Sequence, residues 1–468
     1  MPGVDFKTAT GLCISPMKGY VKIFTYGCQM NDLDSRKMYS LLAGDGWEAT
    51  ESLEKADLVI LNTCSVRQKA YEKALSNIGR LRPYKRRKPS LIIAVTGCIA
   101  QQKGRDIISR MPHVDIVLGT HQLHRIREAV DEKREENRQV VDIRFSECIP
   151  SLDIVPEKAF IAPAHRAYIN IMQGCNNYCS YCIVPYVRGR EISRDHAGIL
   201  EEVRGHAARG VKEIFLLGQN VNSYSGGIGF PELLRHIDRV EGIERIRFTT
   251  SHPKDMSGEL IACFAELEKL CNHIHLPFQS GSDQVLALMN RQYTRRIYLG
   301  LVEKLRKARP DIALSADVIV GFPGETDDAY RQTLSLIQEV RFDTLYSFRY
   351  SVRPGTGAAA IEDHVPPEEK SLRLSELQGI QRAITLEINR SRTGATPLVL
   401  ADGVSLRNPG QIHGRTTQNA IVNFAGPQSL VSSVVKVRIT RANPNSLTGE
   451  MDLEQIPAQW YESESWKS

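Results

Sequence analysis

The residues most able to do chemistry in this sequence are its ten cysteines, at positions 13, 28, 64, 98, 148, 175, 179, 182, 263 and 271. Three of them form one compact set, Cys175-x-x-x-Cys179-x-x-Cys182, directly after a predicted strand. Thiolates are soft ligands that suit iron–sulfur clusters and zinc. Three thiolates in one loop could hold a [4Fe–4S] cluster and leave one iron open to a substrate. The alternative is a structural zinc site with a distant fourth ligand.

A second set of cysteines is spread along the chain. Cys28, Cys64 and Cys98 are 36 and 34 residues apart, and each follows a predicted strand. Neighbouring parallel strands lie about 4.8 Å apart, and ligands of open α/β sheets bind outside the carboxyl ends of the strands. Three thiols at adjacent strand ends could therefore hold a second cluster, although buried structural cysteines are also common there. The other four cysteines lack such contexts, and we interpret them as structural or incidental.

The elements that must position these cysteines follow two α/β alternations. In the first third of the chain, strands are predicted at 20–26, 56–63, 91–97 and 114–118, with helices between them. This pattern indicates a parallel sheet with helices on its faces. In the second alternation, strands are predicted at 167–172, 213–217, 243–249, 273–276, 313–320 and 344–350. Six such units favour a partial or complete (β/α) barrel.

The end of the chain has a different character. Residues 366–391 show a long helix pattern, and short apolar alternations at 397–400, 420–424 and 431–439 follow it. These alternations, separated by Gly, Pro and Asn, predict a small antiparallel β-barrel. The fold class is therefore α/β, with a parallel-sheet domain at 18–140, a partial (β/α)6 barrel at 160–391 and the small barrel at 394–458.

Composition and charge narrow the function classes. The 468 residues are 42% hydrophobic and 24% charged, which is typical of a folded globular protein. No stretch approaches the ~18 apolar residues of a membrane helix, and residues 1–18 lack a signal-peptide core, which disfavours secretion and membrane insertion. The net charge of +6 is uneven, because residues 80–88 (RLRPYKRRK) hold six basic residues and no acid. Such a segment is either a solvated surface or the footprint of a nucleic acid.

The Cys175 loop resembles the signature of the radical S-adenosylmethionine (SAM) enzymes. In that superfamily the open iron chelates the amino and carboxylate groups of SAM, and one electron cleaves the sulfonium to give a 5′-deoxyadenosyl radical. Partial (β/α)6 barrels are the usual fold of these enzymes, in agreement with the predicted strands. A polar segment follows five of these strands, where a barrel builds its active site.

The order of the cysteine segments narrows the resemblance further. TYG-Cys28-QMN, LNT-Cys64-SVR and VTG-Cys98-IAQ, followed by the Cys175 loop, resemble the methylthiotransferase family over residues 19 to about 453. In that family an N-terminal cluster takes part in delivering sulfur. The resemblance implies two [4Fe–4S] clusters, ligated by Cys28, Cys64 and Cys98 and by Cys175, Cys179 and Cys182, with SAM as cofactor.

The same resemblance implies roles for individual side chains around the barrel. Gln219 and Asn220 lie where the SAM amino group is held, and Gln279, Ser280 and Asp317 where its ribose or methionyl part is held. The backbone of 318–322, including Ile319, is similar to the segment that binds adenine, and Tyr181 lies within the cluster loop. The implied substrate-binding residues are Arg188, Arg190, Glu191, Arg194, Arg349 and Arg415.

The C-terminal domain resembles the RNA-associated TRAM domain. Its stretch 414–424 is similar to the G-R-T…V-N-F stretch of family members that act on isopentenyl-adenosine in tRNA, with Ala420 where a basic residue is usual. We therefore expect a cytoplasmic, monomeric enzyme that methylthiolates carbon 2 of N6-isopentenyladenosine. The anticodon stem-loop of tRNA would dock across the C-terminal barrel and the mouth of the (β/α) barrel.

The expected enzyme would take electrons from a low-potential donor such as flavodoxin or ferredoxin, and no membrane partner is expected. Two other substrates stay open, namely threonylcarbamoyl-adenosine in tRNA and an aspartate of a ribosomal protein. A different class, a non-catalytic RNA-binding iron–sulfur protein, also stays open.

Overall fold

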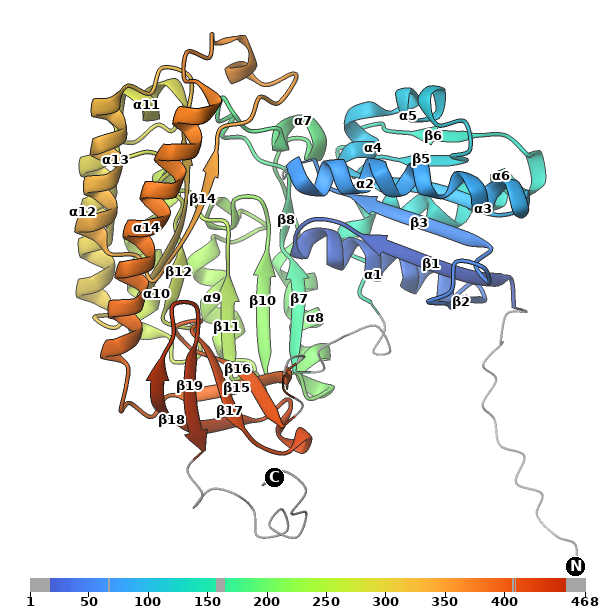
Figure 1. Cartoon of the computed structure of the whole chain (residues 1–468). Coiled ribbons are helices and arrows are strands. Elements are labelled where there is room, and N and C mark those ends of the chain that lie inside the picture. Colours follow the sequence, from blue (N-terminus) through green and yellow to red (C-terminus); the bar gives the residue numbers. More distant parts are fainter. Residues whose placement is uncertain (1–16, 66–67, 157–164, 406–407, 409, 452–468) are drawn as a thin grey trace, which may run out of the picture. The chain divides into compact units, whose positions relative to one another are not determined.

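The computed structural model describes residues 17–65, 68–156, 165–405, 408 and 410–451, so Cys13 lies outside it. The chain forms two compact units that divide after Ser146 (Figure 1). No helix of the described ranges is long and apolar enough to cross a membrane. The two units are described one at a time.

The first unit is built on a six-stranded sheet in which all pairings are parallel and the strand order is β2-β1-β3-β4-β5-β6. Its strands are β1 (Gly19–Thr25), β2 (Trp47–Ala49), β3 (Leu58–Thr63), β4 (Ile92–Gly97), β5 (Ile116–Leu118) and β6 (Val140–Asp142). Its helices are α1 (Gln29–Ala43), α2 (Gln68–Arg80), α3 (Arg82–Arg87), α4 (Cys98–Lys103), α5 (Arg105–Arg110) and α6 (Ile126–Glu136). The four strands expected from the sequence are present, and the short strands β2 and β6 lie at the two edges.

Both faces of this sheet are covered because successive side chains of a strand point to opposite sides. In β3, Leu58 and Ile60 belong to the apolar core that includes residues of α1 and α6. Val59 and Leu61 belong to a second core, which includes residues of α2, α4 and α5. The central strands are therefore buried along their whole length, which explains the uninterrupted apolar runs in the sequence.

The second unit begins with an arc of six parallel strands. They form two three-stranded sheets, β11-β10-β7 and β12-β13-β14, and a parallel bridge between Ile246 and Leu270 links the two. The strands are β7 (Arg166–Asn170), β10 (Glu213–Leu217), β11 (Arg245–Phe248), β12 (His273–His275), β13 (Ala313–Val320) and β14 (Thr344–Arg349). Strands β7 and β14 end the arc without pairing to each other among the described residues, so the expected (β/α)6 barrel is partial.

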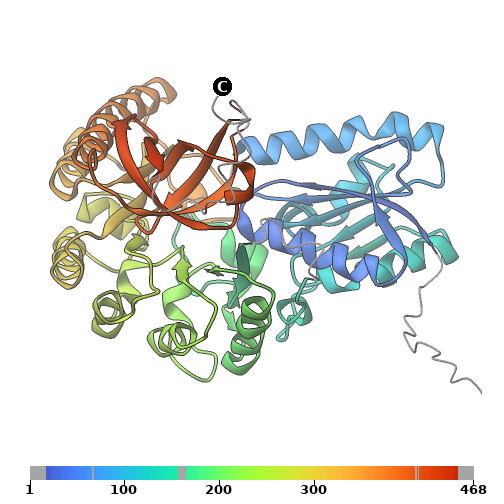
Figure 2. The same cartoon turned by 90° about the horizontal axis from the view of Figure 1, so that it is seen from below.

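Helices form the outer layer of this arc, as Figure 2 shows. The helices of this layer are α8 (His196–Ala208), α9 (Phe230–Asp238), α10 (Gly258–Glu266), α12 (Arg295–Ala308), α13 (Asp327–Val340) and α14 (Pro367–Ser391). Two short helices, α7 (Val184–Arg188) and α11 (Asp283–Leu288), lie at the carboxyl ends of the strands (Figure 1). A short antiparallel pair, β8 (Met172–Gln173) and β9 (Ile192–Ser193), brackets the Cys175 loop.

The C-terminal part of the second unit is a closed five-stranded barrel in the order β15-β16-β17-β19-β18. Its strands are β15 (Leu398–Val404), β16 (Gln411–Thr416), β17 (Ile421–Ala425), β18 (Val434–Ala442) and β19 (Leu447–Met451). The barrel is antiparallel as expected, except that β17 and β19 pair in parallel to close it. Strands β16 and β19 were not among the expected strands, and the sequence of β16, QIHGRT, contains a single large apolar residue, Ile412.

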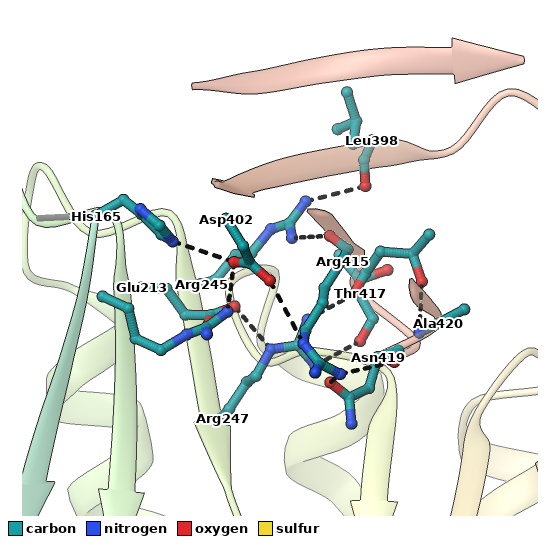
Figure 3. A network of polar contacts seen from close by, with 12 residues as sticks. His165, Glu213, Arg245, Arg247, Leu398, Asp402, Arg415, Thr417, Asn419 and Ala420 are labelled. Carbon is teal, nitrogen blue, oxygen red and sulfur yellow. Dashed lines mark hydrogen bonds and ion pairs between the residues drawn. The ribbon is translucent and has the colours of Figure 1, made fainter. Parts of the chain in front are cut away.

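This barrel is attached to the arc by a buried polar junction at the starts of β7, β10 and β11 (Figure 3). Arg247 donates hydrogen bonds to the carbonyls of Thr416 and Thr417, at 2.6 and 3.1 Å. Arg245 donates to the carbonyls of Leu398 and Arg415 in the same way. The C-terminal barrel therefore lies at the amino ends of these strands, whereas the Cys175 loop follows their carboxyl ends.

Carboxylates neutralise the arginines of this junction. Glu213 is fully buried and pairs with Arg166 and Arg247. Asp402 of the C-terminal barrel accepts from Arg166 at 3.0 Å and lies 3.1 Å from His165 Nε2. Burial raises the pKa of Asp402, but the hydrogen bond from His165 and the nearby arginines outweigh burial and lower it. The lowered pKa means that the ionised form of Asp402 stabilises the folded state.

We expect Asp402→Asn to lower the free energy of unfolding by about 3 kcal/mol, because it removes one partner of a buried charge network. The contribution of Asp402 is present above the ordinary carboxyl pKa of about 4 and is lost as the pH falls below it. Chemical unfolding at pH 7 and pH 3 checks both points, and the difference between variant and wild type should shrink at pH 3. As a control, Glu450→Gln breaks an exposed pair with Arg438 in the same barrel and should cost under ~1 kcal/mol. Equal effects of the two variants would contradict this account of the junction.

Candidate active site

The loop that carries Cys175, Cys179 and Cys182 follows β8, at the carboxyl side of the arc. It needs glycine at its first position, because Gly174 has φ +84° and a Cβ there would lie 2.0 Å from the carbonyl oxygen of Arg190. The amide of Gly174 donates to Gln219 Oε1 at 2.6 Å, and the amide of Cys175 donates to the carbonyl of Gly189 at 3.2 Å. The first half of the loop is thus fixed by the segments that follow β10 and α7.

The second half of the loop is held by the residues at the end of α11. Ser180 donates through Oγ to the carbonyl of Leu288 at 2.7 Å and through its amide to the carbonyl of Met289 at 3.0 Å. Asn290 donates to the carbonyl of Tyr178 at 3.1 Å. These residues prearrange the three thiols before any metal is present.

The three thiols are close enough to influence one another's ionisation. Burial raises the pKa of Cys175 to about 11 and that of Cys182 to about 12, and the neighbouring Cys179 thiol adds to both shifts. Cys175 and Cys182 are therefore protonated at neutral pH, and a cationic metal core is what would convert them to thiolates. In the same place Arg291 donates to Cys179 Sγ at 3.4 Å.

Buried polar atoms without a hydrogen-bond partner gather at the same strand ends. Two acceptors, Asn220 Oδ1 and Gln279 Oε1, and three potential donors, Gln173 Nε2, Ser251 Oγ and His252 Nε2, have none. Leaving a buried polar group unpaired costs free energy, so such a group signals a ligand or ordered water. SAM carries an ammonium and hydroxyl donors as well as a carboxylate acceptor, and this mixture of atoms fits it.

His252 shows how strongly this site is desolvated. It is 5% exposed, and burial, aided by the charges of Arg291 and Lys254, lowers its pKa to about 2. The neutral ring accepts the amide of Lys254 at Nδ1, so Nε2 carries the hydrogen and faces no partner. His252 is thus available as a neutral donor.

The residues expected to contact SAM have different surroundings. Asn220 and Gln279 are buried and each keeps an unpaired oxygen. Gln219 already accepts the amide of Gly174, and Ser280 is 1% exposed and accepts the amide of Ser282 at 3.3 Å. Asp317 lies 3.5 Å from His275 Nε2.

The backbone segment expected to bind adenine and Tyr181 of the cluster loop lie together. The amide of Ile319 donates to the carbonyl of Gln279 at 3.0 Å. Ile319 and Tyr181 both pack against the small apolar cluster that contains Phe322 and Tyr350. The structure thus brings 279–280, 317–319 and Tyr181 to one side of the site.

The six residues expected to bind substrate are dispersed. Arg190 and Arg349 are exposed, and Glu191 is partly buried, where it accepts from Ser223 at 2.7 Å. Arg188 and Arg194 are 3% and 6% exposed, and Arg194 is paired with Glu202 and Asp153. Arg415 belongs to the buried junction, 3.4 Å from Asp402.

The three cysteines of the first unit lie at one edge of its sheet. Thr63 and Gly97 are paired in the β3–β4 register, so Cys64 and Cys98 follow at the same level. Gly27, with φ +124°, passes so close to Cys64 that a Cβ there would lie 3.0 Å from the Cys64 sulfur. Cys28 therefore follows a turn that passes directly beside Cys64.

Buried side chains interlock these three strand ends. Asn31 donates to the carbonyl of Thr63 at 2.9 Å and accepts from the Cys28 thiol at 3.6 Å. Thr63 donates to the carbonyl of Thr96 at 2.6 Å, and its Oγ1 accepts the amide of Ile99 at 3.2 Å. Ser65 Oγ and Thr96 Oγ1, beside this edge, are buried and have no hydrogen-bond partner among the described residues. The edge thus combines three thiols with unpaired polar atoms, which fits a polar inorganic ligand.

Neither cysteine set is arranged around a single ion. The described residues contain no group of three His, Cys, Asp or Glu side chains that could hold one metal ion. A zinc site needs ligands that converge on one atom, whereas a four-iron cluster takes each thiolate on a different iron.

Several features of the site have weak or no sequence signals. The sequence does not identify Gln173, Arg291 or Tyr293 as residues of the site. The only feature of the segment 288–293 (LMNRQY) is an arginine next to an apolar helix, which does not indicate a contact with the cysteines. The strand-end position of Ser251 and His252 was the usable signal for those two residues.

Comparison with known proteins agrees with this division of the chain. Residues 20–119 match an uncharacterised protein family, UPF0004. Residues 169–337 match the radical SAM superfamily, and residues 390–451 match the TRAM domain.

Relatives match along almost the whole chain. A protein of Geotalea uraniireducens named tRNA-2-methylthio-N(6)-dimethylallyladenosine synthase is 53% identical over 91% of this chain and 97% of its own. A protein of the same name from Geobacter metallireducens is 52% identical over 92% and 98%. Among solved structures, the radical SAM methyltransferase TsrM of Kitasatospora setae has a TM-score of 0.52 at 15% identity, covering 83% of this chain and 79% of its own. This last similarity concerns the fold alone.

Proposed function

Because this chain belongs to the family of the tRNA-2-methylthio-N(6)-dimethylallyladenosine synthases, we propose that it installs a methylthio group at carbon 2 of N6-isopentenyladenosine beside the anticodon of tRNA. It is a radical SAM methylthiotransferase with two [4Fe–4S] clusters and SAM as cofactors. The observation that carries this conclusion is the presence of both cysteine sets at strand ends in a chain whose relatives match over more than nine tenths of its length.

The C–H bond at carbon 2 of adenine has no acidic proton for a general base, so the reaction needs radical chemistry. When bound, SAM and the cluster held by Cys175, Cys179 and Cys182 would supply radical chemistry, and the cluster held by Cys28, Cys64 and Cys98 would supply sulfur chemistry. The side chains of the protein bind and orient the cofactors and the substrate, and they shield them from solvent. Gln219 fixes the backbone of the Cys175 loop, and we propose that the unpaired atoms of Asn220, Gln279 and His252 bind polar groups of SAM.

The ligands that we propose are Cys28, Cys64 and Cys98 for the cluster of the first unit and Cys175, Cys179 and Cys182 for that of the second. Near SAM we propose Asn220, Gln279, Asp317, the Ile319 backbone and Tyr181, with Gln219 and Ser280 acting through the loops that they hold. For RNA we propose the exposed Arg190 and Arg349 first, since Arg188 and Arg194 are buried and Arg415, whose side chain is 34% exposed, is paired with Asp402.

The remaining proposals concern organisation and partners. We propose functional domains at 18–140, 160–391 and 394–458, a monomer, and a cytoplasmic enzyme that receives electrons from a low-potential donor of the flavodoxin or ferredoxin class. The C-terminal barrel lies at the amino ends of the arc strands, so an RNA that touches both this barrel and the Cys175 loop must extend along the second unit.

Complementation tests the proposed function in cells. The chain is expressed in a bacterial strain that makes N6-isopentenyladenosine in tRNA but lacks its own methylthiotransferase for it. Digestion of bulk tRNA and mass spectrometry should then reveal the 2-methylthio nucleoside. Its absence, when the purified protein carries iron and the control gene restores the product, would contradict the proposal.

A basic surface of the first unit is a candidate RNA contact. Helix α3 buries none of its residues. Lys85 and Lys88, in and just after this helix, are paired with Asp115 and Asp57 at 2.7 Å. Arg82, Arg86 and Arg87 are exposed and form no ion pair within the described residues. Their charges are therefore available to phosphates.

We expect the triple variant Arg82→Gln, Arg86→Gln, Arg87→Gln to bind tRNA about tenfold more weakly at low salt. The slope of the logarithm of the binding constant against the logarithm of the salt concentration should also become less steep by up to about three. Fluorescence anisotropy across a salt series measures both quantities. The matched control removes three exposed charges elsewhere in the same unit, at Lys73, Arg105 and Arg110. An equal loss of affinity in both variants would show that only net charge matters, and the surface would not be a contact.

A further inference from the structure

Arg291 is a buried cation directly beside the cysteine loop. It is 4% exposed and lies just after α11, in the segment that holds the second half of the loop. Its three donor nitrogens are all used: Nη1 donates to Cys179 Sγ at 3.4 Å, Nη2 to the carbonyl of Pro277 at 2.8 Å, and Nε to Tyr293 Oη at 3.1 Å.

None of these partners is a carboxylate. The buried arginines of the junction are neutralised by a carboxylate, since Arg166 and Arg247 share Glu213. Arg291 has no such counter-charge among the described residues, although a guanidinium stays protonated and a buried unpaired charge is costly. The ionisable side chains that act on its guanidinium are the phenols of Tyr293 and Tyr181 and the thiol of Cys179, not carboxylates.

We propose that Arg291 is the built-in counter-charge of the sulfur ligands in the Cys175 loop, and that it favours the reduced state of the cluster they hold. The inference rests on the proposed ligation of a cluster by Cys175, Cys179 and Cys182. With three thiolates, a [4Fe–4S]2+ core has a net charge of −1. Gain of one electron from an external donor makes it −2, with no bond formed or broken. A fixed cation stabilises the more negative state, and an N–H···S hydrogen bond acts in the same direction.

The position of Arg291 is fixed rather than adaptable. Tyr293 accepts from Nε and donates in turn to the carbonyl of Phe278 at 2.8 Å, and its ring is 7% exposed. The planar guanidinium is therefore oriented on two sides by groups other than the thiol, which leaves Nη1 directed at Cys179. A lysine would keep the charge but not this fork of donors. Arg291 thus holds a positive charge in a fixed position beside the Cys179 sulfur. Its effect should be visible in the midpoint potential of the cluster.

The test measures the midpoint potential of this cluster alone. In a background with Cys28, Cys64 and Cys98 replaced by Ala, reconstituted full-length protein is titrated with dithionite and followed by electron paramagnetic resonance. We expect Arg291→Met to shift the midpoint to a more negative potential and Arg291→Lys to shift it less. The control, Arg295→Met, removes an arginine paired with Glu339 and should leave the potential unchanged.

Iron content is measured first in every variant, which separates this inference from the ligation on which it rests. Full iron with an unchanged potential in Arg291→Met overturns the role of Arg291 and leaves the ligation standing. Should Arg291→Met fail to take up iron, Arg291→Lys and Tyr293→Phe decide, because both disturb the N–H···S contact. A negative shift in both supports the proposal, and an unchanged potential in both overturns it.

Discussion

Replacing Cys175, Cys179 and Cys182 together by Ala is expected to reduce the iron content from about eight to about four per chain and to abolish cleavage of SAM. The reason is that these thiols share one loop, fixed at both ends by hydrogen bonds to Gln219 and to the end of α11, and no other described cysteine follows a strand of the arc with such support. Iron analysis after anaerobic reconstitution and chromatography of 5′-deoxyadenosine measure the two effects.

The matched control removes three thiols of the same unit that lie elsewhere. Cys263 and Cys271 are buried in or beside the arc, and Cys148 is exposed in the segment that precedes it. Their triple replacement by Ala should keep the full iron content and SAM cleavage. If instead the control loses iron while the Cys175 variant keeps it, the cluster assignment is wrong. A wild-type protein that binds tRNA but releases no 5′-deoxyadenosine would indicate the non-catalytic iron–sulfur class.

Replacing Cys28, Cys64 and Cys98 by Ala should have a different outcome. About four irons should remain, SAM should still be cleaved, and methylthio transfer should be lost, because the Cys175 loop belongs to the other compact unit. The expected signature is 5′-deoxyadenosine release without a methylthio nucleoside in the digested tRNA. Asn31→Ala offers a milder test, since it removes the amide that contacts both Cys28 and the carbonyl of Thr63. Undiminished methylthio transfer in the triple variant would contradict the proposed role of this edge.

The positions of both cysteine sets could be predicted because they depend on local patterns. Apolar runs of five to eight residues gave β3, β4 and β13 nearly to the residue, and a thiol that directly follows a parallel strand must lie at the ligand-binding edge. The pairing of Thr63 with Gly97 then places Cys64 beside Cys98 without further information. The arc of six strands was likewise visible in the alternation of strands and helices.

Contacts between distant segments could not be predicted in this way. Arg415 lies in a sequence motif that is typical of an RNA contact. In the structure it belongs to a junction with Asp402, Arg166 and Arg245, which come from three other strands. Arg188 and Arg194 follow the cluster loop in sequence, and their burial depends on partners such as Glu202. Arg291 reaches Cys179 across 112 residues, so its role has no local signature. Sequence spacing reports which side chains share an edge, but the partner of each charge depends on tertiary packing.

The most direct measurement of the central claim is a comparison of substrates under anaerobic conditions. Reconstituted enzyme, SAM and reductant are incubated separately with tRNA that carries N6-isopentenyladenosine, with tRNA that carries threonylcarbamoyl-adenosine, and with the ribosomal protein whose aspartate is the alternative acceptor. Mass spectrometry of digested products detects the replacement of a hydrogen by a methylthio group. We predict product from the isopentenyladenosine tRNA alone. Product only from one of the other two substrates would contradict the proposed function.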